Sequence, residues 1–273
     1  YAQGFNLTRR MPLWVRPKEP ITRDIVHELL SSKYENSWLD PSNDVSSGAE
    51  HSPYRYNGLT WTIGNTTFVN ERIVGTQFTA WHFVAEIDSK RPSSTRALLF
   101  WGSDDHAWSP KIPLFGGASE VHIAYDDKNC SARLRCRRQH GLPGSMMSFS
   151  WDTAYWTNSA VARLVYQDVD RASAIVHKAQ KCFDRYVDSA VKETLKLYDI
   201  APAEIILNSL AVRTGAEANR RWRDLWEVLM VTLQDGLNAS IDESNLLCGC
   251  KKTSPTYDET WLSTVANNTG ARY

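Results

Sequence analysis

The spacing of hydrophobic residues changes once along this chain of 273 residues, and the change restricts the fold more than any other feature. Between about residues 59 and 126, short runs rich in β-branched and aromatic residues are separated by Gly, Pro, Asn and Asp, which is typical of β-strands. The segments between the runs are too short for helical crossovers, so the strands should pair as an antiparallel meander. The predicted strands are 59–63, 78–86, 96–101 and 121–125.

From about Trp156 onward, the hydrophobic residues recur with the spacing of an α-helix. One apolar stripe falls within 160–165, a second spans 170–198, and a third covers 222–233, shortly before Gly236, a residue type that often ends helices. The tryptophans of the third stripe match a buried helical face. They are therefore predicted to pack in the core and not to form a stacking platform.

A shorter helix is predicted over 22–34, because Thr22 can cap it and apolar residues follow with helical spacing. Strands followed by long helices predict an α+β fold in which helices pack on an antiparallel sheet. The sequence contains no internal repeat. A single domain over 1–273 is expected, with the polar stretch 238–273 wrapping its surface.

Charge and hydropathy exclude some classes of partner. The 31 lysine and arginine residues balance the 31 aspartate and glutamate residues, so no global field favours binding to nucleic acid or to an anionic membrane. No apolar run approaches the roughly 18 residues of a membrane span. The sequence starts at Tyr1, without an initiator methionine or signal peptide, which predicts either a trimmed chain or one piece of a proteolytically processed protein.

Possible N-glycosylation sites favour a lysosomal or secreted location. The Asn-x-Ser/Thr rule is satisfied at Asn6, Asn65, Asn129, Asn238 and Asn267.

The five cysteines are compatible with that location. Cys130 and Cys136 flank a short arginine-rich loop that a disulfide could close. Cys248 and Cys250 are separated by one residue, so each is predicted to bond elsewhere, unless the pair forms a strained, redox-active link. Cys182 lies in a helical pattern and is predicted to be buried and reduced. The odd total leaves one thiol free or bonded to another chain.

The segment 101–115 concentrates polar and aromatic residues directly after a predicted strand. Its acidic pair, Asp104 and Asp105, could act as a carboxylate dyad, but adjacent side chains usually diverge. This favours a turn-forming pair or contact with a substrate amine. A metal site formed by Asp104, Asp105 and His106 with His82 or His122 is disfavoured for the same reason, so no metal ion is predicted.

A second charged motif, Glu71-Arg72, enters an apolar segment. It could form an internal ion pair at a strand end. Alternatively, the arginine could hold a carboxylate or support a catalytic thiolate. The sequence lacks the G-x-S-x-G elbow, the glycine-rich phosphate loop, the H-E-x-x-H motif and the C-x-x-C pair, so no cofactor is predicted.

Five segments resemble, in the same order, the carboxy-terminal part of the C69 dipeptidase family, a group of cysteine-dependent amino-terminal-nucleophile hydrolases. The resemblance extends from about residue 10 to about residue 200. It implies a four-layer αββα fold, with two antiparallel sheets between layers of helices. The segments are RMPLWV at 10–15, SPYR at 52–55, ERIVGTQFT at 71–79, FWGSDD at 100–105 and SFSWDTAYW at 148–156.

The family's nucleophile is the cysteine at the amino terminus of the mature enzyme, and its α-amino group acts as the base. The thiolate attacks an amide carbonyl, and hydrogen-bond donors stabilise the oxyanion. Tyr1 cannot supply this chemistry, and none of the five cysteines lies in a matching segment. The resemblance therefore implies that the nucleophile belongs to a separate amino-terminal chain of the same precursor.

The resemblance also implies roles for residues of this chain. Loops at one end of the sheet frame the cleft in this fold, so aromatic faces are expected for substrate side chains and a carboxylate for its amine. Arg72 is the candidate catalytic residue, positioned to support the thiol. The candidate substrate-binding residues are Trp101, Gly102, Asp104, Asp105 and Trp151.

The expected activity is hydrolysis of amide bonds, most directly in dipeptides, by the larger chain of a two-chain cysteine hydrolase. Two alternatives stay open. The chain could be a non-catalytic member of the fold that binds a partner in its cleft, or part of an amidase acting on N-acyl conjugates. The sequence also leaves open whether the protein forms a homo-oligomer.

Overall fold

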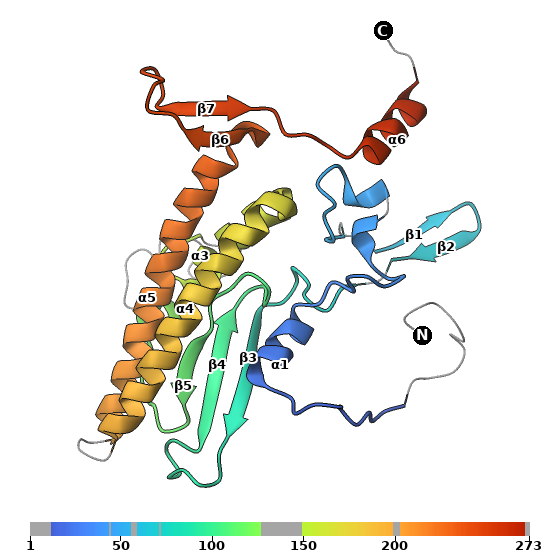
Figure 1. The fold of residues 1–273 in the computed structure, drawn as a ribbon. Coiled ribbons are helices and arrows are strands. Elements are labelled where there is room, and N and C mark those ends of the chain that lie inside the picture. The colour runs from blue at the N-terminus through green and yellow to red at the C-terminus, as the bar shows by residue number, and fades with distance from the viewer. Residues whose placement is uncertain are drawn as a thin grey trace.

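The computed structural model describes residues 12–43, 45–55, 59–70, 72–126, 149–198 and 203–270. A small antiparallel sheet lies beside a layer of long helices, the amino-terminal helix lies at the other side of the sheet, and two hairpins lie apart from it (Figure 1). This mixture of antiparallel strands and segregated helices is an α+β fold, as the sequence predicted.

The central sheet consists of β3 (Trp81–Ile87), β4 (Ala97–Ser103) and β5 (Ile112–Phe115), in that spatial order. Both pairs are antiparallel, which confirms the predicted meander. The strands β3 and β4 fall within or near the predicted runs 78–86 and 96–101. The third strand, β5, was not predicted, and its Pro113 lies opposite Phe100 of β4.

Two separate hairpins lie apart from the central sheet (Figure 1). The first pairs β1 (Thr60–Ile63) with β2 (Thr66–Val69), and it begins at the predicted strand 59–63. The second pairs β6 (Asn238–Ile241) with β7 (Cys250–Thr253).

The predicted strand at 121–125 is wrong. Residues Ile123–Tyr125 form a 3₁₀-helix instead, because the side chain of His122 accepts a hydrogen bond from the Ala124 amide and so caps a helical turn. Other 3₁₀-helices cover Pro41–Asn43, Val45–Ser47 and Gln234–Gly236.

The helices occur where the spacing predicted them. The first, α1 (Arg23–Leu30), begins after Thr22, whose side chain accepts a hydrogen bond from the Ile25 amide. The stripe near 160–165 belongs to α3 (Ala154–Gln167), the stripe over 170–198 to α4 (Val169–Leu197), and the stripe over 222–233 to α5 (Ala203–Thr232). A last helix, α6 (Glu259–Thr269), was not predicted.

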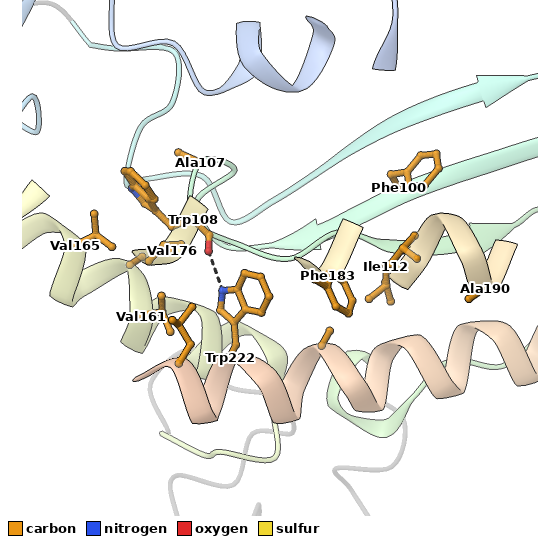
Figure 2. Close-up of a cluster of buried hydrophobic side chains, with 14 of the residues drawn as sticks. Phe100, Ala107, Trp108, Ile112, Val161, Val165, Val176, Phe183, Ala190 and Trp222 are labelled. Carbon is orange, nitrogen blue, oxygen red and sulfur yellow. Dashed lines mark hydrogen bonds between the residues drawn. The ribbon is translucent and has the colours of Figure 1, made fainter. Parts of the chain in front are cut away.

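The core lies between the sheet and α3, α4 and α5 (Figure 2). Trp222 of α5 is fully buried, and its indole nitrogen donates a hydrogen bond of 2.8 Å to the carbonyl of Trp108, which ties the helix to the loop after β4. This confirms that Trp222 is a core residue. Fully buried neighbours include Leu98, Ile112, Val161, Val176 and Phe183.

The helical layer lies against β4 and β5, so β3 is left as the edge strand on the other side. Alternate residues of β3 point to one face of the sheet and are exposed: Trp81 at 59%, Phe83 at 46% and Ile87 at 75%. The rings of Trp81 and Phe83 stack with centroids 6.1 Å apart. We call this surface, with the half-buried Leu99 and Trp101 of β4 opposite it, the open face.

Residues 238–270 follow the end of α5 and include no buried residue. They form the β6–β7 hairpin and α6, which lie at the upper side of the molecule in Figure 1. Across the part of the chain that the structure describes, none of the helices has both the length and the apolar character to cross a bilayer.

Candidate active site at the end of the central sheet

Two sequence-predicted site segments meet at one end of the sheet. Because β3 and β4 are antiparallel, Trp81 at the start of β3 pairs with Ser103 at the end of β4. The loop that enters β3, with Arg72, and the loop that leaves β4, with Asp104 and Asp105, therefore lie at the same end. The Asp104 amide joins them by donating a hydrogen bond of 2.8 Å to the carbonyl of Ala80.

Asp104 is the most unusual residue at this end. Its φ of 72° lies in the left-handed region, which few residues other than glycine, asparagine and aspartate adopt. Its side chain is 5% exposed. Burial, together with the charge of Asp105, raises the pKa of its carboxyl group to about 7, although a hydrogen bond from the Asp105 amide lowers it. Strained backbone and a perturbed acid in one residue are typical of functional sites.

Asn158 of α3 approaches the same place. Its amide nitrogen donates a hydrogen bond of 3.0 Å to the carbonyl of Ser103, immediately before Asp104. Its amide oxygen is buried and has no hydrogen-bond partner in the structure. A buried acceptor of this kind is costly unless a donor reaches it. Sequence analysis missed Asn158, although the residue interrupts the apolar stripe of its helix with a polar side chain.

Asp105 is held by the protein itself. One carboxylate oxygen accepts a hydrogen bond of 2.9 Å from the Ala107 amide, and the other accepts one of 2.7 Å from the Tyr166 hydroxyl. The side chain is fully buried, which raises the pKa of the carboxyl group to about 6 although both hydrogen bonds lower it. These contacts match the turn-forming alternative of the sequence analysis.

Gly102 serves the packing of a histidine. A Cβ atom at this position would lie 2.2 Å from Nε2 of His82, which shares the sheet face. The ring of His82 is fixed by a contact of 3.1 Å between Nδ1 and the carbonyl of Asp104. The glycine thus allows an imidazole to support the turn at Asp104.

Trp101 and Trp151 lie in different surroundings. Trp101 points to the open face and packs edge-on against Tyr125, with ring centroids 5.6 Å apart. Trp151 packs on α5 instead, at 5.0 Å from the ring of Trp226 and 5.7 Å from the guanidinium carbon of Arg223. Trp101 therefore belongs to the sheet end, whereas Trp151 contacts the helical layer.

Arg72 is exposed, and its guanidinium carbon lies 5.0 Å from the ring centroid of Phe78. The arginine is thus held in the loop before β3 by a cation–π contact. The ion-pair alternative involves Glu71, which lies outside the described residues.

Three histidines gather behind the sheet end. Nδ1 of His27 in α1 lies 3.0 Å from Nε2 of His106, and the ring of His82 packs edge-on against His106 with centroids 4.3 Å apart. Burial lowers the pKa of His27 to about 4 and that of His82 to about 3, and the Lys111 charge lowers both further. The imidazoles are therefore neutral at pH 5 to 7. Among the described residues, no set of three or more His, Cys, Asp or Glu side chains is arranged to hold a metal ion.

A large cleft of about 1670 Å³ separates α1 from α4 on this side. Ala107 and Lys111 of the loop after β4 contribute to its wall. Lys111 is half-buried, and removal of its ammonium group from water lowers the pKa of that group to about 8, while Asp184 raises it. The ammonium group donates a hydrogen bond of 2.9 Å to the carbonyl of His106. The loop from Asp104 to Lys111 thus connects the end of β4 with the wall of this cleft.

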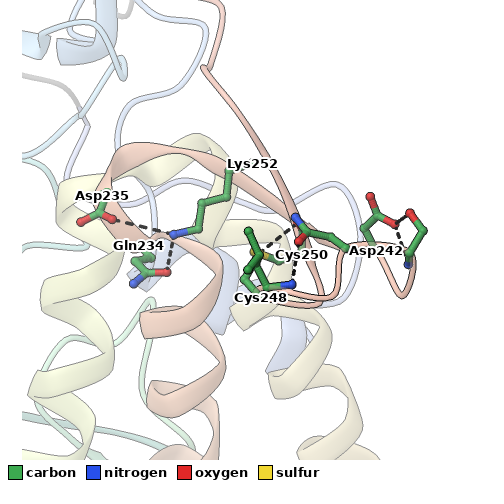
Figure 3. Close-up of a disulfide and its surroundings, with 9 residues drawn as sticks. Gln234, Asp235, Asp242, Cys248, Cys250 and Lys252 are labelled. Atoms are coloured by element: carbon green, nitrogen blue, oxygen red, sulfur yellow. Dashed lines mark hydrogen bonds and ion pairs between the residues drawn. A yellow bond between two sulfur atoms is a disulfide. The ribbon is translucent and has the colours of Figure 1, made fainter.

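The predicted cysteine chemistry needs two corrections. Cys248 and Cys250 are bonded to each other (Figure 3), so the expectation that each bonds elsewhere is wrong and the alternative of a direct link holds. Cys182 is free, as predicted, but it is exposed and not buried, because the buried stripe of α4 includes Val176, Phe183 and Val187 and not Cys182. Cys130 and Cys136 lie outside the described residues.

Three predicted glycosylation sites are exposed. Asn65 lies in the β1–β2 turn, Asn238 begins β6 and Asn267 lies in α6. Asn6 and Asn129 fall outside the described residues.

The comparison with protein families covers the region that contains the segments quoted above. No curated protein matches this chain. Residues 5–182, well over half of the sequence, match Peptidase family C69. With this match, and with the segments 72–79 and 100–105 brought to one end of an antiparallel sheet, the chain belongs to peptidase family C69.

Proposed function

We propose that this chain provides the scaffold and substrate cleft of a cysteine-dependent amide hydrolase that cleaves dipeptides, and that its nucleophile lies on a separate amino-terminal chain. Membership of peptidase family C69 carries the proposal, because it assigns a peptidase chemistry. The cysteines that the structure describes support a nucleophile from elsewhere, since Cys248 and Cys250 are bonded together and Cys182 lies inside α4 and not at a chain terminus.

The open face supports a second chain. Trp81, Phe83 and Ile87 form an apolar strip on an edge strand, and such strips usually mark an interface. Two sheets pack face to face about 10 Å apart when their apolar faces meet. A second antiparallel sheet on the open face would complete the αββα arrangement and would cover these side chains. The amino-terminal chain is the occupant that the family membership favours.

The sheet end supports a substrate site. In the proposed enzyme, the cysteine thiolate attacks the peptide carbonyl, the leaving amine departs with a proton, and water then releases the acyl group. Arg72 is the proposed support of the thiolate, by its positive charge. Asp104 is the proposed partner of the substrate's free ammonium group, and Trp101 offers an aromatic face. The buried Asn158 oxygen is a further acceptor for a substrate N–H group.

The acid at Asp104 suits a ligand with a positive charge. With no ligand bound, burial keeps its carboxyl group protonated up to a pH of about 7. An ammonium group beside it would favour the carboxylate and lower that pKa, so binding and ionisation would be coupled. Two hydrogen bonds hold Asp105 in the turn. Asp105 would then act as a positioning residue for Asp104.

We further propose a lysosomal or secreted glycoprotein. The exposed positions of Asn65, Asn238 and Asn267 support it, because a glycan can be attached only where the side chain reaches solvent.

The decisive test is to sequence the amino terminus of every polypeptide in the native protein and to weigh the intact assembly under non-reducing conditions. A companion chain beginning with cysteine is expected, and alkylation of that cysteine should abolish amide hydrolysis. A homogeneous species of 31.0 kDa would contradict the proposal. A companion chain with an inert first residue would instead identify a non-catalytic binding protein.

Substrate class is tested by comparing dipeptides with N-acyl amides on the native protein and on Asp104→Asn. If Asp104 binds the substrate ammonium, the variant should raise the KM for dipeptides about tenfold or more and leave N-acyl amides unchanged. Asp224→Asn, on the exposed surface of α5, is the matched control and should change neither. Equal losses on both substrate classes would rule out ammonium recognition. Faster wild-type turnover of N-acyl amides would identify the amidase alternative.

A further inference from the structure

A disulfide lies at the exposed end of the β6–β7 hairpin, outside the proposed active site (Figure 3). It joins Cys248 to Cys250 across a single residue, Gly249. The φ of Gly249 is +62°, and glycine adopts this left-handed conformation at low cost. The glycine therefore allows the chain to turn sharply enough for the two sulfur atoms to meet.

This disulfide contributes little to the stability of the fold. A disulfide stabilises a protein mainly by closing a loop in the unfolded chain, and the effect decreases as the loop becomes shorter. Here a single residue, Gly249, separates the two cysteines, so the closed loop is very short and the stabilisation is small. Its conformation is already fixed by Asn245, whose side chain donates to the carbonyl of Cys250 at 2.8 Å and accepts from the Leu247 amide at 3.0 Å.

The hairpin is also attached to the molecule without the disulfide. Lys252 of β7 donates a hydrogen bond of 2.9 Å to Gln234, at the end of α5, and lies 4.0 Å from Asp235. Reduction of Cys248 and Cys250 would therefore leave both the loop and its attachment in place.

The surroundings of the disulfide favour attack by a thiol from another molecule. Cys248 is exposed, and Cys250 is half-buried and followed by Lys251 and Lys252. Positive charge next to a cysteine stabilises its thiolate, which makes the Cys250 sulfur the better leaving group. Beside the disulfide, Leu246 is 96% exposed and Leu247 is 99% exposed. These two solvent-exposed leucines provide an apolar surface that can bind a polypeptide next to the sulfur atoms.

We propose that the Cys248–Cys250 loop is a thiol–disulfide exchange site for a cysteine-containing polypeptide with apolar residues beside its cysteine. A partner thiolate attacks the Cys248 sulfur, a mixed disulfide forms, and the Cys250 sulfur leaves as a thiolate that takes up a proton. A second thiolate of the partner then attacks the partner sulfur that is bonded to Cys248. The partner's two sulfur atoms become linked, and Cys248 is released as a thiolate. The partner dithiol is oxidised by two electrons, and the loop is reduced by two electrons.

The chemistry is tested on the native protein after its free thiols have been blocked with N-ethylmaleimide. The protein is equilibrated in mixtures of reduced and oxidised glutathione, quenched and alkylated, and the mass of the peptide carrying Cys248 and Cys250 is measured. Half-reduction is expected in mixtures at least about 100-fold more oxidising than those that reduce a structural disulfide closing a long loop. A pair that stays oxidised in those mixtures would overturn the proposal.

The direction of attack is tested with a peptide that contains one cysteine between leucines. Rapid quenching should trap the peptide on Cys248 and the alkylating reagent on Cys250. The reverse labelling pattern would contradict the assignment of Cys250 as the leaving group.

Recognition is tested with the double variant Leu246→Ser/Leu247→Ser. It should slow exchange with the leucine-flanked peptide about tenfold, the effect of losing roughly one buried leucine, and leave exchange with glutathione unchanged. Val231→Ser, an exposed apolar residue on α5, is the matched control. If the double variant exchanged with the leucine-flanked peptide as fast as the wild type does, the two leucines would not contribute to recognition, and this part of the proposal would be wrong. None of these outcomes depends on amide hydrolysis, so the two proposals fail separately.

Discussion

Asp104 and Gly102 show how single residues set the end of the central sheet. Gly102 leaves the space that the ring of His82 occupies, and that ring contacts the carbonyl of Asp104. Asp104 in turn adopts the left-handed conformation that redirects the chain from β4 into the loop. Each residue is explained by its neighbour, so a change at either one should be measurable.

Gly102→Ala should destabilise the fold. The added Cβ atom would lie 2.2 Å from Nε2 of His82 and 3.0 Å from the carbonyl oxygen of Pro110, so the ring must move and lose its contact with Asp104. Overpacking of this kind costs about 1–3 kcal/mol of unfolding free energy. Urea denaturation measures the loss. Gly116→Ala is the control, because its Cβ atom would meet Ala97 at an ordinary 3.8 Å; similar losses in both variants would contradict the explanation.

Asp104→Asn should change how stability depends on pH. The folded chain keeps this carboxyl group protonated up to a pH of about 7, whereas an aspartate in the unfolded chain ionises near pH ~4. Between these values the carboxyl group is ionised in the unfolded chain and protonated in the folded chain, so the folded state binds more protons. The free energy of unfolding therefore falls as pH rises, by at most about 1.4 kcal/mol per pH unit.

Asparagine tolerates the left-handed backbone and does not titrate, so the variant isolates this contribution. Measured by urea denaturation from pH 4.5 to 7, the unfolding free energy of the wild type should fall relative to that of Asp104→Asn. Parallel pH profiles for the two proteins would show that Asp104 ionises normally in the folded chain.

At the scale of elements, α1 differs from the other helices. No residue of α1 is buried, whereas α3, α4 and α5 each bury a continuous stripe. The helix is attached by polar contacts: His27 and Ser31 with His106, Arg23 with Asp188 at 3.0 Å, and the Gly75 amide with the carbonyl of Ser32. An element attached in this way should open more easily than the core helices.

Ser31→Ala should increase the local opening of α1. The Ser31 hydroxyl donates a hydrogen bond of 2.8 Å to the carbonyl of His27 and lies 3.0 Å from Nδ1 of His106. Loss of a hydrogen bond worth about 1 kcal/mol should speed amide hydrogen exchange over 23–30 about fivefold, without changing exchange in α5. Ser32→Ala is the control, because among the described residues the Ser32 hydroxyl bonds within the turn, to Tyr34 and Glu35. Uniform acceleration across the molecule would show that α1 unfolds only with the core.

The elements that could be predicted from the sequence are those whose signals are local. The helix periods and the Thr22 cap are read over a few residues, and they located α1, α3, α4 and the carboxy-terminal part of α5, whose beginning at Ala203 was not predicted. The strand β5 was not predicted because proline is unusual in a strand and β5 contains Pro113. Its strand conformation is identified by its pairing with β4. At 121–125, alternation predicted a strand, but the cap by His122 gives a helical turn.

The candidate site was predictable only in part. The order of the segments located its loops, because β3 and β4 had to be neighbours. The hydrogen bond from Tyr166 to Asp105, the position of Asn158 beside Ser103 and the space for His82 beside Gly102 depend on residues 20 to 61 positions away in the chain, which no local pattern reports.

At the scale of the whole molecule, the exposed strip on β3 should make the isolated chain associate with itself. Trp81→Lys should lower the fraction of dimers or larger species of the isolated 273-residue chain several-fold, because a charge on an edge strand opposes pairing. Sedimentation velocity measures the species. Ile63→Lys, an equally exposed apolar residue on the β1–β2 hairpin, is the control; equal effects of both variants would indicate general solubility and not the open face.

The same strip has a consequence for the order of events during synthesis. Exposed aromatic and aliphatic side chains on the edge strand β3 favour aggregation with other chains as soon as the sheet forms. If one precursor supplies both chains, the segment destined for this surface arrives already tethered and at high effective concentration. The cut that separates the two polypeptides is then best made after they have folded together.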